Sequence, residues 1–300
     1  MGTTTGFEPA SQKGKETAML KKVMDVTPEE GAGANAPTLH RKVFTVDKGE
    51  RECMGFIHLA SKPTPAGHKT TPYRKSAEET IFTLSGSMDM VMDDVEYRLT
   101  PGTALAISRG QVISHAKVGP EGWEALTGFC SQCPLYLAEH PRFPAGSTEI
   151  PRSFPNIDSY PAGRLPAASY ERLVRAKEDV TPAEGANAAT AQTVHRDVFS
   201  PSAGNRSYQS FMYMESKESP PAPEGSKAFT KSGEEVIYTL RGTSATIHNG
   251  EKLTTGPGTA FANKRGDQNI GAGTSAGGTD KVSWYCMKCP LYLRDHPRLT

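Results

Sequence analysis

Residues 78–86 read Glu-Glu-Thr-Ile-Phe-Thr-Leu-Ser-Gly, and residues 234–242 read Glu-Glu-Val-Ile-Tyr-Thr-Leu-Arg-Gly. Six of these nine positions are identical in the two stretches. Both stretches are rich in β-branched and aromatic residues and both end in glycine, which predicts a strand followed by a turn. The recurrence indicates that the chain contains two copies of one unit.

The repeat extends well beyond this stretch in both directions. The other matching blocks are 26–31 with 180–185, 38–44 with 193–199, 101–104 with 257–260, and 130–142 with 286–298. The separation between matching residues drifts only from 154 to 156 positions. The 300-residue chain is therefore a tandem duplication of a unit of about 150 residues, an ordinary domain size.

The charge balance and the lack of long apolar runs limit the functional classes. The 34 Lys+Arg residues offset 33 Asp+Glu residues, a net charge of +1 that argues against binding nucleic acid through its phosphates. No apolar run approaches the ~20 residues of a membrane helix, and the first residues have no basic or apolar region of a secretory signal. We expect a cytoplasmic protein that binds a small-molecule ligand and neither nucleic acid nor a membrane. A homo-oligomer is compatible with the sequence.

Short apolar runs between turn-forming residues, spaced by about ten residues, predict an all-β fold of sandwich or barrel type. We expect residues 1–19 to be disordered, 20–143 to form the first domain and 169–300 the second. Residues 144–168, which contain five prolines, are expected to be an extended linker. Thr27 and Thr181, each followed by proline, are expected to begin short helices.

The positions shared by the two copies resemble the cupin superfamily. The resemblance rests on a glutamate, a glycine seven residues later, a Pro-Gly turn and an Arg-Gly pair, found at Glu79, Gly86, Pro101-Gly102 and Arg109-Gly110 and again at Glu235, Gly242, Pro257-Gly258 and Arg265-Gly266. Two copies in one chain resemble a bicupin. This implies two tandem jelly-roll-like β-barrels, each with a pocket at its mouth, together with short helices and the Pro-rich linker.

The metal-ligand positions of the cupin family are altered in both copies. The family's His-x-His pair falls on Tyr73 and Lys75 and, in the second copy, on Phe229 and Lys231, while its later histidine falls near Ile113 and on Asn269. A lysine ammonium has no lone pair with which to bind a metal ion. A conventional site of three histidines and one glutamate is therefore not expected in either copy.

Two other kinds of site remain open. In the first barrel, His115, His58, His68 and Glu79 are candidates for a rearranged site for Fe, Mn, Ni or Zn, against the alternative that these are ordinary histidines. In both barrels, Lys75 with Glu79 and Lys231 with Glu235 are four residues apart and therefore on the same side of a strand. These pairs, with Tyr73, are candidate catalytic residues of a metal-free polar centre, and the alternative is an exposed salt bridge.

Two further groups are candidates for metal or ligand binding. Cys130 with Cys133, and Cys286 with Cys289, have the C-x-x-C spacing of a zinc site. Either His140 and His296 help to complete two local sites, or both cysteine pairs converge on a single all-cysteine site. Redox thiols and a purely structural turn are the alternatives. Arg109, Arg265 and Asn269 are candidate ligand-binding residues, because arginine pairs well with carboxylates, and an inter-domain salt bridge is the alternative for the arginines.

By analogy with the family, the resemblance implies an enzyme that acts on a small polar organic molecule in a barrel pocket, of dioxygenase, isomerase or lyase type. A non-catalytic bicupin that binds or senses a ligand is the first alternative, and a structural or storage protein is the second. The residues themselves name neither a substrate nor a reaction.

Overall fold

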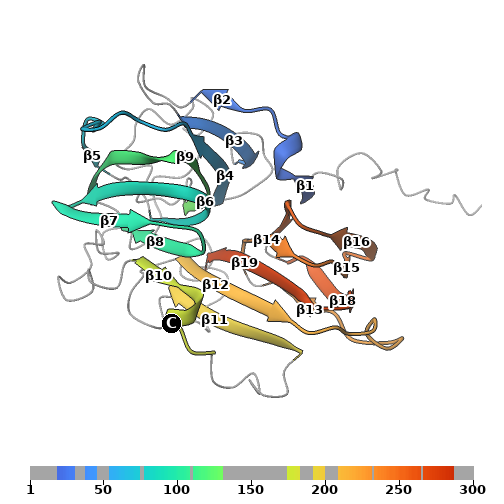
Figure 1. Ribbon diagram of the computed structural model, residues 1–300. Helices are drawn as coiled ribbons and strands as arrows, with labels where there is room; N and C mark the ends of the chain where they lie inside the picture. Colours follow the sequence, from blue (N-terminus) through green and yellow to red (C-terminus); the bar gives the residue numbers. More distant parts are fainter. Residues whose placement is uncertain are drawn as a thin grey trace, which may run out of the picture.

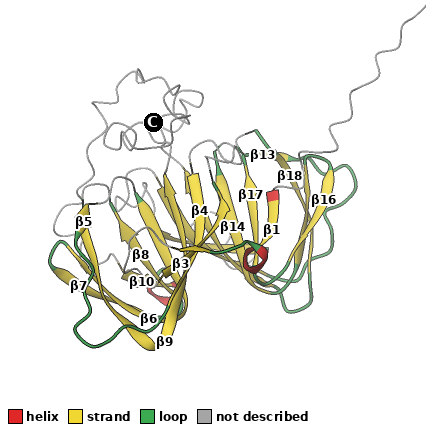
Figure 2. Cartoon of the chain, turned by 90° about the horizontal axis from the view of Figure 1, so that it is seen from above, coloured by secondary structure: helices red, strands yellow, loops and turns green. Residues whose placement is uncertain are grey.

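The computed structural model describes residues 19–30, 38–45, 54–74, 78–108, 111–130, 174–182, 192–199, 209–231, 233–264 and 266–286. The fold is all-β, as expected, and consists of two β-barrels that lie side by side (Figures 1 and 2). Two single 3₁₀ turns, η2 (Val23–Asp25) and η6 (Lys177–Asp179), are the helical elements of the described residues. In that part of the chain no helix has the length and apolar character needed to span a membrane.

The first barrel is built from one continuous sheet. Its strands from the first half are β2 (Glu29–Glu30), β3 (Thr38–Phe44), β4 (Met54–Ser61), β5 (Tyr73–Arg74), β6 (Glu79–Met92), β7 (Val95–Leu99), β8 (Thr103–Ile107) and β9 (Val112–Cys130). The strand order is β10-β8-β6-β9-β4-β3-β2, with β5 paired to β9 and β7 paired to β6. All of these pairs are antiparallel.

The second barrel is built from two facing sheets. Its strands from the second half are β11 (Thr193–Phe199), β12 (Gln209–Ser216), β13 (Phe229–Thr230), β14 (Glu235–Arg241), β15 (Ser244–His248), β16 (Glu251–Thr255), β17 (Thr259–Asn263), β18 (Gln268–Thr274) and β19 (Thr279–Cys286). One sheet has the order β1-β17-β14-β19-β12-β11, and the other has the order β13-β18-β15-β16.

The glycine that ends the repeated stretch lies inside β6 in the first barrel, and between β14 and β15 of different sheets in the second. Gly86 has a φ of 68°, and a Cβ at this position would lie 2.0 Å from the carbonyl oxygen of Gly122. Gly242 repeats this geometry, with a φ of 74° and a distance of 2.0 Å to the oxygen of Gly278. A left-handed φ and a close backbone approach both require glycine, so the motif marks the corner of each barrel.

The two halves exchange their first strands. Strand β1 (Leu20–Lys22) precedes the first barrel in sequence but pairs with β17 of the second barrel. Strand β10 (Val174–Ala176), the equivalent segment of the second half, pairs with β8 of the first barrel (Figure 1). Each barrel therefore contains a strand from the other half, which the division into 20–143 and 169–300 does not include. Residues 144–168 and 1–18 lie outside the described residues.

The expected helix start at Thr27 is wrong, whereas the one at Thr181 continues into residues 183–191, which lie outside the described residues. The 3₁₀ turns η2 and η6 come before Thr27 and Thr181, whereas Glu29 and Glu30 form strand β2. These two residues pair with His40 and Leu39 of β3, so ladder hydrogen bonds replace those of a helical turn. In the second half, the turn is closed by Asp179, whose Oδ2 accepts a hydrogen bond of 2.7 Å from the backbone N–H of Ala176.

Aromatic side chains form the contact between the barrels. The ring of Trp284 lies 5.1 Å from that of Phe56 and 4.9 Å from that of Phe211, centroid to centroid. Its indole N–H donates a hydrogen bond of 3.0 Å to the carbonyl oxygen of Thr80, in the other half. Trp284 and Trp123 are 0% and 2% exposed, so both tryptophans are packing residues.

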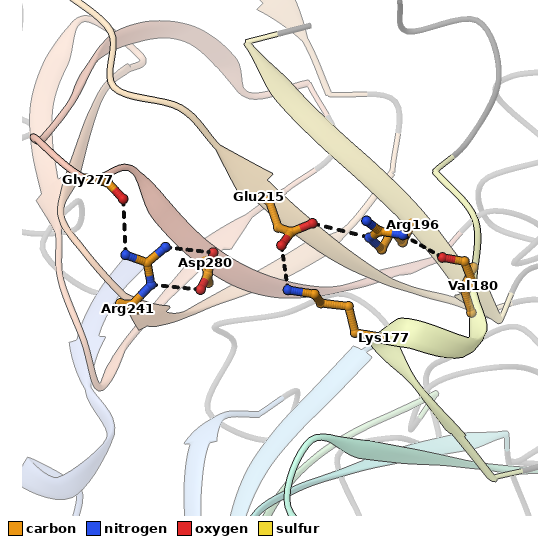
Figure 3. A network of polar contacts seen from close by, with 7 residues as sticks. All are labelled: Lys177, Val180, Arg196, Glu215, Arg241, Gly277 and Asp280. Carbon is orange, nitrogen blue, oxygen red and sulfur yellow. Dashed lines mark hydrogen bonds and ion pairs between the residues drawn. The ribbon is translucent and has the colours of Figure 1, made fainter. Parts of the chain in front are cut away.

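A polar network on the second barrel holds the segment that follows β10. Lys177 donates to Glu215 of β12 at 2.5 Å, and Arg196 of β11 donates to the same carboxylate at 3.2 Å and to the carbonyl oxygen of Val180 at 2.7 Å (Figure 3). These contacts lower the pKa of Glu215, against the opposing effect of its desolvation. The exchanged strand is therefore anchored to both barrels, and Arg196 has a bracing role in the structure.

Candidate functional site

The two motif glutamates occupy the same position in the two barrels. Glu79 begins β6 and lies opposite Ile107 and Phe129, and Glu235 begins β14 and lies opposite Asn263 and Tyr285. Their exposed fractions are 6% and 4%. Both carboxylates are therefore buried, and a buried carboxylate requires hydrogen-bond donors or a cation.

Glu235 has its expected partner, Lys231, which follows directly after β13. The ammonium of Lys231 donates to Oε2 of Glu235. Asn263 donates to the same oxygen at 3.2 Å, and Ser283 donates to Oε1 at 2.7 Å. The side chain of Lys231 is 18% exposed and that of Glu235 is 5% exposed. The predicted ion pair is present, and it lies in the barrel rather than on an exposed surface.

A chain of hydrogen bonds connects Glu235 to the facing sheet. Asn269 of β18 donates to Oδ1 of Asn263 at 3.0 Å, and His248 of β15 lies 3.2 Å from Oδ1 of Asn269 through its Nδ1. Asn249 lies 3.2 Å from the other ring nitrogen of His248. Because Oδ1 of Asn269 is an acceptor, Nδ1 of His248 is the donor, and every bond of the chain points toward Glu235. The chain crosses between the two sheets, so it lies in the interior of the barrel.

A second lysine faces the same interior. Lys281 of β19 donates a hydrogen bond of 2.5 Å to the hydroxyl of Ser244, on the facing sheet. Burial lowers the pKa of Lys281 to about 8, and the negative charge of Glu235 opposes this shift. The interior side chains Lys231, Lys281 and Glu235 thus comprise two basic groups and one acidic group.

The first barrel lacks these polar groups at equivalent positions. Shifting the second-barrel residues by 156 positions gives the counterparts Ile107 for Asn263, Ile113 for Asn269, Met92 for His248 and Ala125 for Lys281. All four counterparts are fully buried members of the hydrophobic core. Glu79 keeps one contact of the second barrel, a bond of 2.6 Å from Thr127, the counterpart of Ser283. The polar interior is therefore a property of the second barrel.

The described residues around Glu235 do not fit a divalent metal ion. Lys231 and Asn269 occupy two of the family's ligand positions, and the ammonium of Lys231 is bonded to Glu235, the carboxylate that would bind the metal. Within the described residues, no group of three or more His, Cys, Asp or Glu side chains could hold a metal ion. A cation at Glu235 would therefore have to displace a like charge.

The histidines of the rearranged metal site are spread over the first barrel. His58 of β4 is buried beside Arg41 and lies opposite Leu126, whereas its neighbour Ile57 lies opposite Thr127, which bonds Glu79. Because side chains alternate along a strand, His58 and Thr127 face opposite sides of the sheet. Burial is the main cause of the lowered pKa of His58. Elsewhere, His115 is held in β9 through its backbone N–H, which bonds Thr70, and His68 lies in the turn before β5.

Several sequence candidates lie outside the described residues, namely Lys75, Arg109, Arg265, Cys133, Cys289, His140 and His296. Tyr73 is placed through its backbone in β5, opposite Ile113. Cys130 and Cys286 end β9 and β19, and the thiol of Cys286 is buried in the hydrophobic core. Zinc binding, redox chemistry and a structural role of the C-x-x-C pairs all stay predictions.

Sequence reasoning missed Lys281, Asn263, His248 and Ser283. The signal was available, because aligning the two copies shows apolar residues replaced by polar ones at three of these positions, while Thr127 matches Ser283. These four residues lie outside the motif positions of the family. Positions that are apolar in the first copy and polar in the second therefore indicate the site better than the positions that both copies share.

Proteins of known structure share the fold of this chain. No family model and no curated protein match the chain. A single-residue variant of oxalate decarboxylase from Bacillus subtilis is similar in structure, with a TM-score of 0.59, 10% identity, and coverage of 96% of this chain and 78% of the other. AerE from Microcystis aeruginosa is also similar, with a TM-score of 0.56, 11% identity, and coverage of 88% of this chain and 98% of the other.

A third similar structure is described as part of work on the Mn(II) centres of the Bacillus subtilis oxalate decarboxylase, with a TM-score of 0.58, 12% identity, and coverage of 96% of this chain and 78% of the other. The chain therefore has the fold of these structures, two tandem cupin-type β-barrels. At identities of 10–12%, the structural similarity extends to the fold alone. The Mn(II) centres are those of the similar protein. In this chain, Lys231 and Glu235 form an ion pair in the second barrel.

Proposed function

We propose that the second barrel binds a small polar organic molecule that carries a carboxylate, and that the protein is an enzyme of lyase or isomerase type acting through acid–base groups. The observation that carries the proposal is the Lys231–Glu235 ion pair inside the second barrel. Lys281 adds a second basic group to the same interior. Two lysines against one glutamate favour an anionic ligand.

The same residues supply proton donors and a proton acceptor. Lys231 is a donor beside the carboxylate of Glu235, and the amide of Asn269 extends the row of donors across the barrel. A substrate carboxylate would be held by the ammonium groups, and Glu235 would take a proton from the substrate while Lys231 returns one. A titratable pair in a protected interior is the arrangement that such chemistry requires.

One specific observation favours a second candidate, a non-catalytic bicupin that binds or senses the ligand. The carboxylate of Glu235 already receives hydrogen bonds from Lys231, Asn263 and Ser283. A base in this state must lose a partner before it accepts a proton. Turnover of a bound molecule separates the two candidates, because a sensor binds its ligand and returns it unchanged.

The test uses the full chain and a panel of two- to four-carbon carboxylic acids, with oxalate included because similar folds belong to oxalate decarboxylases. Binding is measured by isothermal calorimetry, and conversion by NMR of the reaction mixture. Lys231→Met is expected to weaken binding at least about tenfold, a loss of ~1.4 kcal/mol. Lys227→Met, which removes an exposed lysine from the loop before β13, is the matched control and should bind normally.

Three results are decisive. Binding with conversion supports the enzyme, and binding without conversion by any member of the panel supports the sensor. Binding by none of the acids, or equal binding by Lys231→Met and the wild type, overturns the assignment of the ligand to the second barrel.

A further inference from the structure

Lys281 is placed differently from the other interior lysine. Its side chain spans from β19 to Ser244 on the facing sheet, and its hydrogen bond goes to a neutral hydroxyl. Within the described part of the chain it forms no ion pair, in contrast to Lys231, which is paired with Glu235. In a protected interior, a carboxylate partner would stabilise the ammonium form of a lysine. Without such a partner, burial favours the neutral amine.

The hydroxyl that receives this bond is itself fixed. Thr255 donates to the carbonyl oxygen of Ser244 at 3.3 Å, and the two hydroxyl oxygens lie 3.0 Å apart. The hydroxyl of Ser244 therefore donates to that of Thr255 and keeps its own oxygen as an acceptor for Lys281. The hydroxyl of Ser244 thus positions the amine of Lys281 as its hydrogen-bond acceptor. When the amine is neutral, the hydroxyl can rotate and donate to it instead.

Both members of this contact occur in the second barrel alone. The counterparts of Lys281 and Ser244 in the first barrel are Ala125 and Met88, both fully buried and apolar. The fold that is common to both barrels therefore does not require this contact. A buried lysine lowers stability when it is charged, so its presence calls for a reason other than folding.

We propose that Lys281 is a nucleophilic amine that forms a Schiff base with an aldehyde or keto group of the carboxylate ligand. This inference rests on the proposed function, because the ligand is the same small carboxylate, and it narrows the substrate class to carbonyl acids. Burial holds the pKa of Lys281 at about 8, which leaves an appreciable neutral fraction near neutral pH.

The step balances without a redox partner. The lone pair of Nζ attacks the carbonyl carbon, the carbonyl oxygen takes a proton to give a carbinolamine, and loss of the hydroxyl with a further proton releases water and forms the C=N bond. One amine and one carbonyl give one imine and one water. Ser283, two residues from Lys281 on β19, donates to Glu235, so the carboxylate lies on the same face of the sheet as the amine and can relay a proton.

The probe is glyoxylate, added to the full-length protein with sodium cyanoborohydride, which reduces an imine to a stable amine. Peptide mapping by mass spectrometry then measures the modified fraction at each lysine. At about pH 7, we expect modification at Lys281 to exceed that at Lys252, an exposed lysine of β16, at least about tenfold. The rate at Lys281 should level off above about pH 8, whereas that at Lys252 should continue to rise.

Matched variants make the result specific. Lys281→Met should abolish the preferred modification, Lys281→Arg should do the same while keeping the positive charge, and Lys252→Met should leave the modification of Lys281 unchanged. Equal modification of Lys281 and the exposed lysines overturns the proposal. If calorimetry shows that carboxylic acids still bind while Lys281 is not selectively trapped, the Schiff base is wrong and the proposed binding function stands. If no acid binds, the proposed function fails first.

Discussion

Glu234 in the second half accepts a hydrogen bond of 2.9 Å from the backbone N–H of Met54 in the first half. Its counterpart Glu78 accepts a bond of 3.0 Å from the backbone N–H of Gln209 in the second half. The contact is reciprocal, as the duplication of the unit requires. In each Glu-Glu pair of the repeated stretch, therefore, the first glutamate joins the two barrels and the second faces the interior of its own barrel.

Replacing Glu234 by alanine should lower the free energy of unfolding by about 1–3 kcal/mol, because the buried N–H of Met54 loses its acceptor. Urea denaturation measures the change. Glu224→Ala, in an exposed loop, is the control and should alter the stability by less than about 0.5 kcal/mol. An equal effect of the two substitutions would show that the contact between the halves contributes nothing to stability.

Gly128→Ala should also destabilise the contact between the barrels. A Cβ at Gly128 would lie 2.4 Å from Cδ1 of Trp284, whose ring is fully buried against Phe56 and Phe211. Overpacking of this kind typically costs about 1–3 kcal/mol. Gly271→Ala is the matched control, since a Cβ there meets no atom within 4 Å. Thermal unfolding of both variants checks the prediction, which is wrong if Gly128→Ala unfolds at the wild-type temperature.

Lys281 should make stability depend on pH in the alkaline range. Its pKa is about 8 in the folded protein and 10.5 as the reference value for the unfolded chain. Between these values the unfolded chain binds more protons than the folded protein, so the free energy of unfolding rises with pH. Lys281→Met removes the cost of burying the charge, and should be more stable than the wild type at pH 7 by up to about 3 kcal/mol.

Denaturant titrations of the wild type and Lys281→Met from about pH 7 to pH 10.5 measure this difference. It should shrink as the pH rises above about 8, because the wild-type amine loses its charge in the folded state first. A difference that stays constant over this range would mean that the methionine acts through packing and that the amine of Lys281 is not buried as described.

The duplication and the all-β fold could be predicted from sequence, because both leave patterns that can be read along the chain. Glycine at position 242, for example, signals a turn. The Lys231–Glu235 pair was also predicted, but from the spacing of residues on one strand, whereas Lys231 follows β13 and Glu235 begins β14 of the other sheet. The pairing of β1 with β17 and of β10 with β8 could not be predicted. Which barrel a short strand joins is decided by packing between segments that are far apart in sequence.

The helix start at Thr27 failed for a related reason. Its capping pattern is a local preference, and the ladder that Glu29 and Glu30 form with β3 outweighs it. The interior site was found only in part, because Asn263 and Lys281 approach Glu235 from other strands. Their inward direction follows from the register of β17 and β19 against β14, which the sequence does not specify.

The central claim is that the second barrel holds the ligand and the first does not. Asn269→Ile tests it most directly, because it places in the second barrel the residue that the first barrel has at Ile113 and breaks the hydrogen-bond chain to His248. Calorimetric titration with the tightest-binding acid of the panel should give one ligand per wild-type chain and at least about tenfold weaker binding to a folded Asn269→Ile protein. Two ligands per chain, or unchanged affinity in the variant, would contradict the account.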